Sequence, residues 1–205
     1  LVRNLPLFSI KDIPNIGIAD SSVRIKLYRL VKAGKITRIK RGVYVHTEYV
    51  NHIRSAGTLN TYLEFLATNI YEPAYLSTEY VLQKYGILSE SVQAITVITT
   101  NKKNRFINSL GMFTYRQINK NLFAGFSLKE KNDLMISTAT VAKALFDFLY
   151  LRKNILKNEN AFRSLRLNLN IVSVRDLKEF KKYVNKENSK KMHLLASFVE
   201  KYGKR

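Results

Sequence analysis

The stretch from Leu27 to Val45 (LYRLVKAGKITRIKRGVYV) constrains the fold more than any other part of the sequence. Apolar residues recur at helical spacing around its start and predict a helix with one buried stripe. The stripe consists of Val23, Leu27, Leu30 and Val31. Gly34 stands where this helix is expected to end, because glycine accepts the left-handed backbone angles of a C-terminal cap.

A short basic hairpin is predicted directly after this helix. Residues 36–39 and 43–45 are β-type runs, and Lys40, Arg41 and Gly42 between them predict a tight turn with two cations at its tip. Helix, glycine and basic hairpin in this order are typical of a winged helix-turn-helix. In that fold the helix enters the major groove of DNA and the hairpin lies along the phosphates.

The polar side of the predicted helix supplies candidate contacts to a nucleic acid. Ser22, Ile25, Arg29 and Lys32 fall opposite the apolar stripe, with Ser21, Lys26 and Tyr28 beside them. A basic surface helix or a basic hairpin taken singly is more often a solvated surface. Their order within a basic chain favours nucleic-acid binding.

The charge balance points the same way. The chain has 35 Lys and Arg against 15 Asp and Glu, a net charge of +20. Residues 1–50 carry ten cations and three anions, residues 51–137 nine and six, and residues 138–205 sixteen and six. A cation excess attracts polyanions and makes their binding salt-dependent. Whether the basic C-terminal part is a second DNA surface or a solvated face stays open at this point.

The sequence lacks the usual signatures of an enzyme. Without cysteines there is no disulfide, Cys–zinc site or thiol catalysis, and a reducing cytoplasm fits. The sequence contains no run of about 18 apolar residues, so no membrane span is predicted. The N-terminus does not have the pattern of a secretion signal. His46, His52 and His193 lie in unrelated segments, and phosphate-binding glycine loops are absent. Glu179 and Lys181 form an ExK string, but in a helical pattern. We therefore expect no catalytic residue, metal or cofactor.

The rest of the chain predicts an α+β protein: an N-terminal winged helix-turn-helix over residues 1–50, then a mixed α+β domain with C-terminal helices over residues 51–205. Ser9 is expected to cap a short helix together with Asp12, and residues 14–17 to form a turn. Lys143 and Asp147 predict a structural ion pair. Further helices are expected at 58–70, 78–85, 141–151, 173–184 and 189–202, strands at 74–76, 92–99, 113–118, 122–126 and 134–136, and a connecting stretch at 48–57.

Four blocks in a fixed order resemble a known family. The first is FSIKDI followed by LYRLVKAGKI and RIKRGVYV, and the second is AYLSTEYVLQKYGILSE followed by QAITVITT. The last two are GMFTYRQI and ATVAKALFDFLYLR. The chain resembles the AbiEi-type antitoxin and transcriptional-regulator family of type IV toxin–antitoxin (abortive infection) systems. The resemblance covers most of residues 8–155.

The resemblance implies a repressor that binds operator double-stranded DNA and opposes a nucleotidyltransferase-type toxin without touching it. A homodimer would fit a palindromic operator. Alternatives are an antitoxin that contacts its toxin directly, a stand-alone regulator, and a nuclease. The DNA contacts that the resemblance implies are Ser21, Ser22, Arg24, Lys26, Tyr28, Arg29 and Lys32 on the helix and Arg38, Lys40 and Arg41 in the hairpin.

Overall fold

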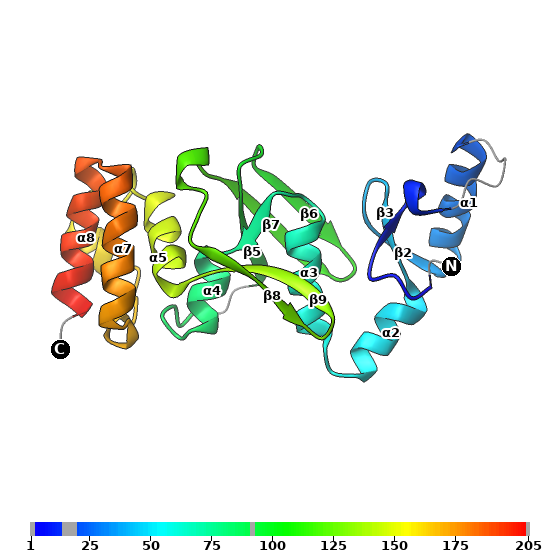
Figure 1. Ribbon diagram of the computed structural model, residues 1–205, viewed down its shortest axis with the longest axis horizontal. Helices are drawn as coiled ribbons and strands as arrows, with labels where there is room; N and C mark the ends of the chain where they lie inside the picture. Colours follow the sequence, from blue (N-terminus) through cyan, green and yellow to red (C-terminus); the bar gives the residue numbers. More distant parts are fainter. Residues whose placement is uncertain (1–2, 14–19, 91–92, 204–205) are drawn as a thin grey trace.

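The computed structural model describes residues 3–13, 20–90 and 93–203. Its elements follow one another along an elongated molecule (Figure 1). A small helix-and-hairpin part occupies one end, a mixed β-sheet the middle, and a layer of helices the other end. The protein is therefore of the α+β class, as the sequence predicts. The predicted turn at residues 14–17 lies outside the described residues.

The N-terminal module, residues 3–46, is compatible with a winged helix-turn-helix. It contains strand β1 (Phe8–Ser9), the 3-10 helix η1 (Ile10–Asp12), helix α1 (Asp20–Lys32) and strands β2 (Ile36–Lys40) and β3 (Val43–His46). The strands form an antiparallel sheet in the order β1-β3-β2. Ser9 and Asp12 form the predicted capping box at η1.

The hairpin turn is narrower than predicted. Lys40 already belongs to β2 and pairs with Val43, so Arg41 and Gly42 alone make the turn. Gly42 has φ +80° and Gly34, after α1, has φ +67°. Both angles fall where glycine is favoured, which explains the two glycines that punctuate the module.

A small apolar cluster holds the module together. Phe8, Leu27 and Ile36 are almost completely buried, and Val23 and Val31 pack against them. Leu30 does not join the cluster, and 41% of it is exposed. The sequence prediction for Leu30 was wrong because the buried stripe of α1 is centred on Leu27, and Leu30 lies at its margin.

The connection to the second part is a helix and not the predicted linker. Helix α2 (Thr47–Ser55) begins directly after β3 and buries Val50. The His46 side chain caps it by accepting a hydrogen bond from the Glu48 backbone N–H at 3.3 Å. Tyr49 and Ile53 also pack against the main apolar core. The sequence prediction missed this helix because most of its other residues are polar.

A six-stranded mixed sheet forms the centre, in the order β6-β7-β5-β4-β9-β8. Pairs β4–β9 and β5–β7 are parallel, and the other neighbours are antiparallel. The strands are β4 (Ala74–Leu76), β5 (Ala94–Thr99), β6 (Asn104–Asn108), β7 (Gly111–Gln117), β8 (Phe126–Lys131) and β9 (Leu134–Ala139).

Helices cover both sides of this sheet. Helix α3 (Leu59–Asn69) lies on one face, where the Tyr115 hydroxyl donates to the Ala67 carbonyl at 2.6 Å. Helices α4 (Thr78–Lys84) and α5 (Val141–Tyr150) lie on the other, where the Tyr75 hydroxyl donates to Asp147 at 3.0 Å. The largest apolar core of the molecule fills the space between these layers.

Two predicted segments differ from the structure, and one strand was not predicted. The strand expected at 122–126 is instead a 3-10 helix, η2 (Lys120–Leu122), and a loop into β8; the Asn119 side chain caps η2. The strand expected at 134–136 is longer in the structure, because β9 continues to Ala139 and pairs with β8. Strand β6 was not predicted, since its exposed residues show little apolar alternation.

The remaining helices stack at the far end of the molecule (Figure 1). They are α6 (Glu159–Arg163), η3 (Leu169–Ile171), α7 (Val174–Glu187) and α8 (Lys190–Gly203). The Ser173 side chain accepts a hydrogen bond from the Asp176 backbone N–H at 3.1 Å, which is the predicted helix start.

Candidate nucleic-acid interface

The outward face of α1 presents the predicted polar side chains to solvent. Ser22, Arg29 and Lys32 are exposed there. Tyr28 is 60% exposed, and the Lys32 Nζ lies 5.1 Å from the centre of its ring. The last turns of the helix thus offer an ammonium group and an aromatic ring side by side. The remaining predicted helix contacts, Ser21, Arg24 and Lys26, are also exposed.

A groove of about 720 Å³ runs between α1, η1 and the hairpin. Arg24, Tyr28 and Val31 line it from α1, where spacings of four and three residues place them on one face. Arg38 and Arg41 line it from the hairpin. The groove therefore brings together four predicted contacts that lie up to 17 positions apart in the sequence, counting from Arg24 to Arg41.

Lys11 also lines this groove, and the sequence reasoning missed it. Lys11 lies in η1, directly after the residue that follows the Ser9 cap. The sequence analysis treated η1 only as a short helix ahead of α1. The positive charge of Lys11 was the only sign in the sequence that it could belong to the site. The direction of its side chain depends on the pairing of β1 with β3, which the sequence did not predict.

The groove is electrostatically one-sided. Its ten described lining residues include four cations and no carboxylate. No salt bridge among the described residues involves Lys11, Arg24, Arg38 or Arg41. Guanidinium groups with free N–H donors fit the oxygens of a phosphate in two-pronged fashion. The arrangement can therefore hold anionic oxygens.

Lys40 lies elsewhere. Its side chain is half-buried, and its Nζ lies 6.0 Å from the ring centre of Tyr71 and 5.8 Å from that of Phe106. Both rings belong to the second part of the protein. Lys40 is the last residue of β2, directly before the turn, and its side chain is directed toward the second part of the protein.

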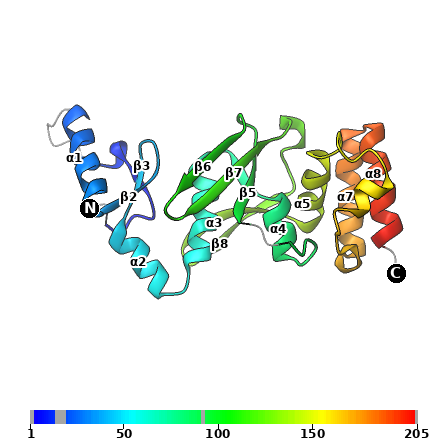
Figure 2. The same cartoon turned by 180° about the vertical axis from the view of Figure 1, so that it is seen from behind.

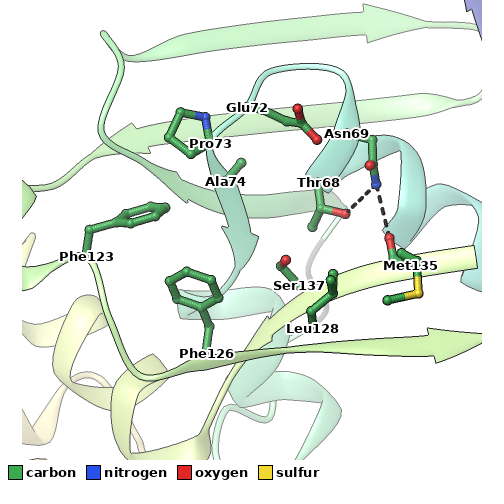
Figure 3. A pocket seen from close by; sticks show the side chains of 10 residues that line it. All are labelled: Thr68, Asn69, Glu72, Pro73, Ala74, Phe123, Phe126, Leu128, Met135 and Ser137. Carbon is green, nitrogen blue, oxygen red and sulfur yellow. Dashed lines mark hydrogen bonds between the residues drawn. The ribbon is translucent and has the colours of Figure 1, made fainter.

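A second, smaller cleft of about 290 Å³ lies beside β4 and β9 (Figure 3). Phe123, Phe126 and Leu128 give it an apolar wall. The Asn69 amide at its other end donates to the Thr68 hydroxyl at 3.1 Å and to the Met135 carbonyl at 3.2 Å. This polar group is therefore already engaged within the protein, and the cleft is mainly an apolar surface.

The carboxylates do not converge. Within residues 3–13, 20–90 and 93–203, no group of three or more His, Cys, Asp or Glu could hold a metal ion. In the ExK string, Glu179 accepts from Thr140 and Tyr183 at 2.8 and 2.7 Å, whereas Lys181 pairs with Glu200 at 3.0 Å. Each is engaged with a different neighbour.

The fold and the groove place the N-terminal module in the class of helix-and-hairpin modules with a cationic groove. A comparison with known families agrees with this class: residues 1–46 match the model of a family described as "Transcriptional regulator, AbiEi antitoxin". This match confirms the family resemblance seen in the sequence over these residues. No curated protein matches the chain. In the part of the chain that the structure describes, no helix is both long and apolar enough to cross a membrane.

Proposed function

We propose that this protein is a sequence-specific binder of duplex DNA that acts as a transcriptional repressor and as the antitoxin of a type IV toxin–antitoxin system. The observation that carries the proposal is the groove in which Arg24 and Tyr28 of α1 meet Arg38 and Arg41 of the hairpin. The family to which residues 1–46 are similar supports the regulatory role. It would act in the cytoplasm, by binding and without catalysis.

We propose different roles for the outward face of α1 and for the cationic groove. The outward face of α1, with Ser22 and Arg29, would face base edges in the major groove. The cations of the groove and hairpin would neutralise phosphates and fix the register of the helix on the duplex. A dimer on a palindromic operator would repeat this arrangement on two half-sites about one helical turn apart, or a multiple of it.

The test is fluorescence anisotropy with the protein's own upstream DNA against scrambled DNA of equal length, across a salt series. We expect a preference for the upstream DNA that survives at about 150 mM salt, because base contacts do not depend on counterion release. Equal affinity for both duplexes, lost as salt rises, would reject specific operator binding. Co-purification with the toxin at high salt would then favour the alternative, neutralisation by direct contact.

A further inference from the structure

The N-terminal module is fixed against the edge of the central sheet. Strand β2 lies beside β6, with the hairpin next to the sheet edge in both views (Figure 2). The Asn108 side-chain N–H donates to the Ile39 carbonyl at 3.0 Å. Ile39 and Val45 of the hairpin also belong to the main apolar core of the second part. The hairpin therefore has a defined neighbour on its outer side.

A short chain of contacts leads from the hairpin to the loop between β5 and β6. The Lys40 ammonium lies over the rings of Tyr71 and Phe106. The Tyr71 hydroxyl in turn donates to the backbone carbonyl of Lys102 at 3.2 Å. Tyr71 thus meets the turn end of β2 with its ring and the β5–β6 loop with its hydroxyl. The loop is held close to the hairpin.

The backbone of this loop is anchored by hydrogen bonds, whereas its two lysine side chains are exposed. The Asn101 side chain donates to the Glu72 carbonyl at 2.7 Å, and its backbone N–H donates to the Thr99 hydroxyl at 3.1 Å. Lys102 and Lys103 follow, both exposed. Neither forms a salt bridge with any described residue. Two unpaired lysines thus stand on a fixed loop beside the proposed DNA-reading module.

We propose that Lys102 and Lys103 contact phosphates of duplex DNA beyond the stretch that the N-terminal module reads, an inference that rests on the proposed function. Lys40 is then a positioning residue, which joins the hairpin to Tyr71 and so sets the distance between the two sets of contacts. An ammonium on a flexible stem suits this role, since a phosphate contact needs charge more than direction. The loop adds affinity and salt dependence without adding sequence preference.

The alternative is that these lysines are simply solvated. Electrostatics allows a clear distinction. Each neutralised phosphate contributes about 0.9 to the slope of log K against log salt on duplex DNA. A solvated lysine contributes little to this slope, and a lysine that contacts flanking DNA contributes only when that flank is present. Duplex length and salt together therefore separate the two cases.

The experiment uses the full chain and two duplexes. One spans only about one helical turn at the centre of the footprint that the protein leaves on its upstream DNA, and the other adds about one helical turn on each side. The test variant is Lys102→Ala with Lys103→Ala. The matched control is Lys178→Ala with Lys182→Ala, two exposed lysines of α7 at the other end of the molecule. Circular dichroism checks that all proteins are folded.

We expect the test variant to lower the salt slope by roughly two on the long duplex and to match the unchanged protein on the short one. The control should match the unchanged protein on both. An unchanged slope on the long duplex, or the same loss on both duplexes, would overturn the inference. If the unchanged protein shows no preference for its own upstream DNA, the proposed function fails, and the slopes on scrambled duplexes of the same two lengths still decide whether the loop contacts phosphates.

Discussion

At the scale of single residues, Gly125 is the described glycine at which an added Cβ would meet the closest contacts. It has φ +78°, and a Cβ there would lie 2.1 Å from the Tyr183 hydroxyl oxygen and 3.0 Å from the Lys143 Cγ. The Tyr183 hydroxyl is held by its hydrogen bond to Glu179. We expect Gly125→Ala to lower the free energy of unfolding by more than the roughly 1–2 kcal/mol that left-handed backbone angles alone cost.

Gly57→Ala is the matched control for this comparison. Gly57 has φ +69°, and nothing lies within 4 Å of its would-be Cβ. Chemical denaturation of both variants therefore isolates the steric contribution. Equal losses of stability would show that the space around Gly125 is not limiting.

The buried ion pair makes a second prediction at this scale. The Lys143 Nζ lies 2.5 Å from the Asp147 Oδ1, and both side chains are fully buried. Tyr75 and Ser77 donate to the other oxygen of Asp147, at 3.0 and 2.8 Å. Burial lowers the pKa of Lys143 and raises the pKa of Asp147, and their mutual attraction opposes both shifts.

Removing the Lys143 ammonium leaves the buried Asp147 carboxylate without an opposite charge. We expect Lys143→Met to cost about 3–5 kcal/mol of unfolding free energy, as broken buried pairs do. Lys178→Met, on the exposed face of α7, should change stability by no more than about 0.5 kcal/mol. Thermal and urea unfolding measure both. A loss below about 1 kcal/mol for Lys143→Met would mean that Asp147 accepts a proton at little cost.

At the scale of elements, substitutions in α1 and in the hairpin should affect DNA binding in different ways. Arg29→Ala removes a donor from the outward face of α1, and we expect it to narrow the difference between upstream and scrambled DNA by about 1–3 kcal/mol. Arg41→Ala should weaken both equally and lower the salt slope by about one. Arg175→Ala on α7 is the charge control. Unchanged binding by both test variants would reject the assignment of these two elements.

The elements themselves were predictable where one periodicity dominates. The stripe around Leu27, the turn at Gly42 and the buried residues of α5 predicted three elements close to their observed bounds. Strand β1 has two residues and β6 is mostly exposed, so neither leaves a pattern. Four of the ten predicted contact residues meet in one groove. The place of Lys40 could not be predicted, because it depends on Tyr71 and Phe106 in another part of the fold.

At the scale of the whole molecule, the two parts share one core. Val45 and Val50 are buried in the main apolar cluster and not in the small cluster around Leu27. The Tyr62 hydroxyl also donates to the Pro6 carbonyl at 2.7 Å. The predicted boundary after residue 50 falls inside α2, which continues to Ser55. The N-terminal module is thus joined to the sheet by packing as well as by the chain.

This shared packing predicts that the N-terminal module and the central sheet unfold together. Val45→Ala removes apolar contact from the shared core, and we expect a loss of about 1–3 kcal/mol. Hydrogen exchange should then quicken in the protected amides of α1 and of β5 alike, because both depend on the same cooperative unit.

Val23→Ala is the companion variant, because Val23 packs against the small cluster of the N-terminal module and not against the shared core. In one cooperative unit, its loss of stability should also reach β5, because unfolding of the unit exposes the amides of α1 and β5 together. If Val23→Ala quickened exchange in α1 and its neighbours alone, the two parts would be independent units joined by α2. The β5–β6 loop would then have no fixed position relative to the hairpin, and phosphate contacts from Lys102 and Lys103 would lose their structural basis.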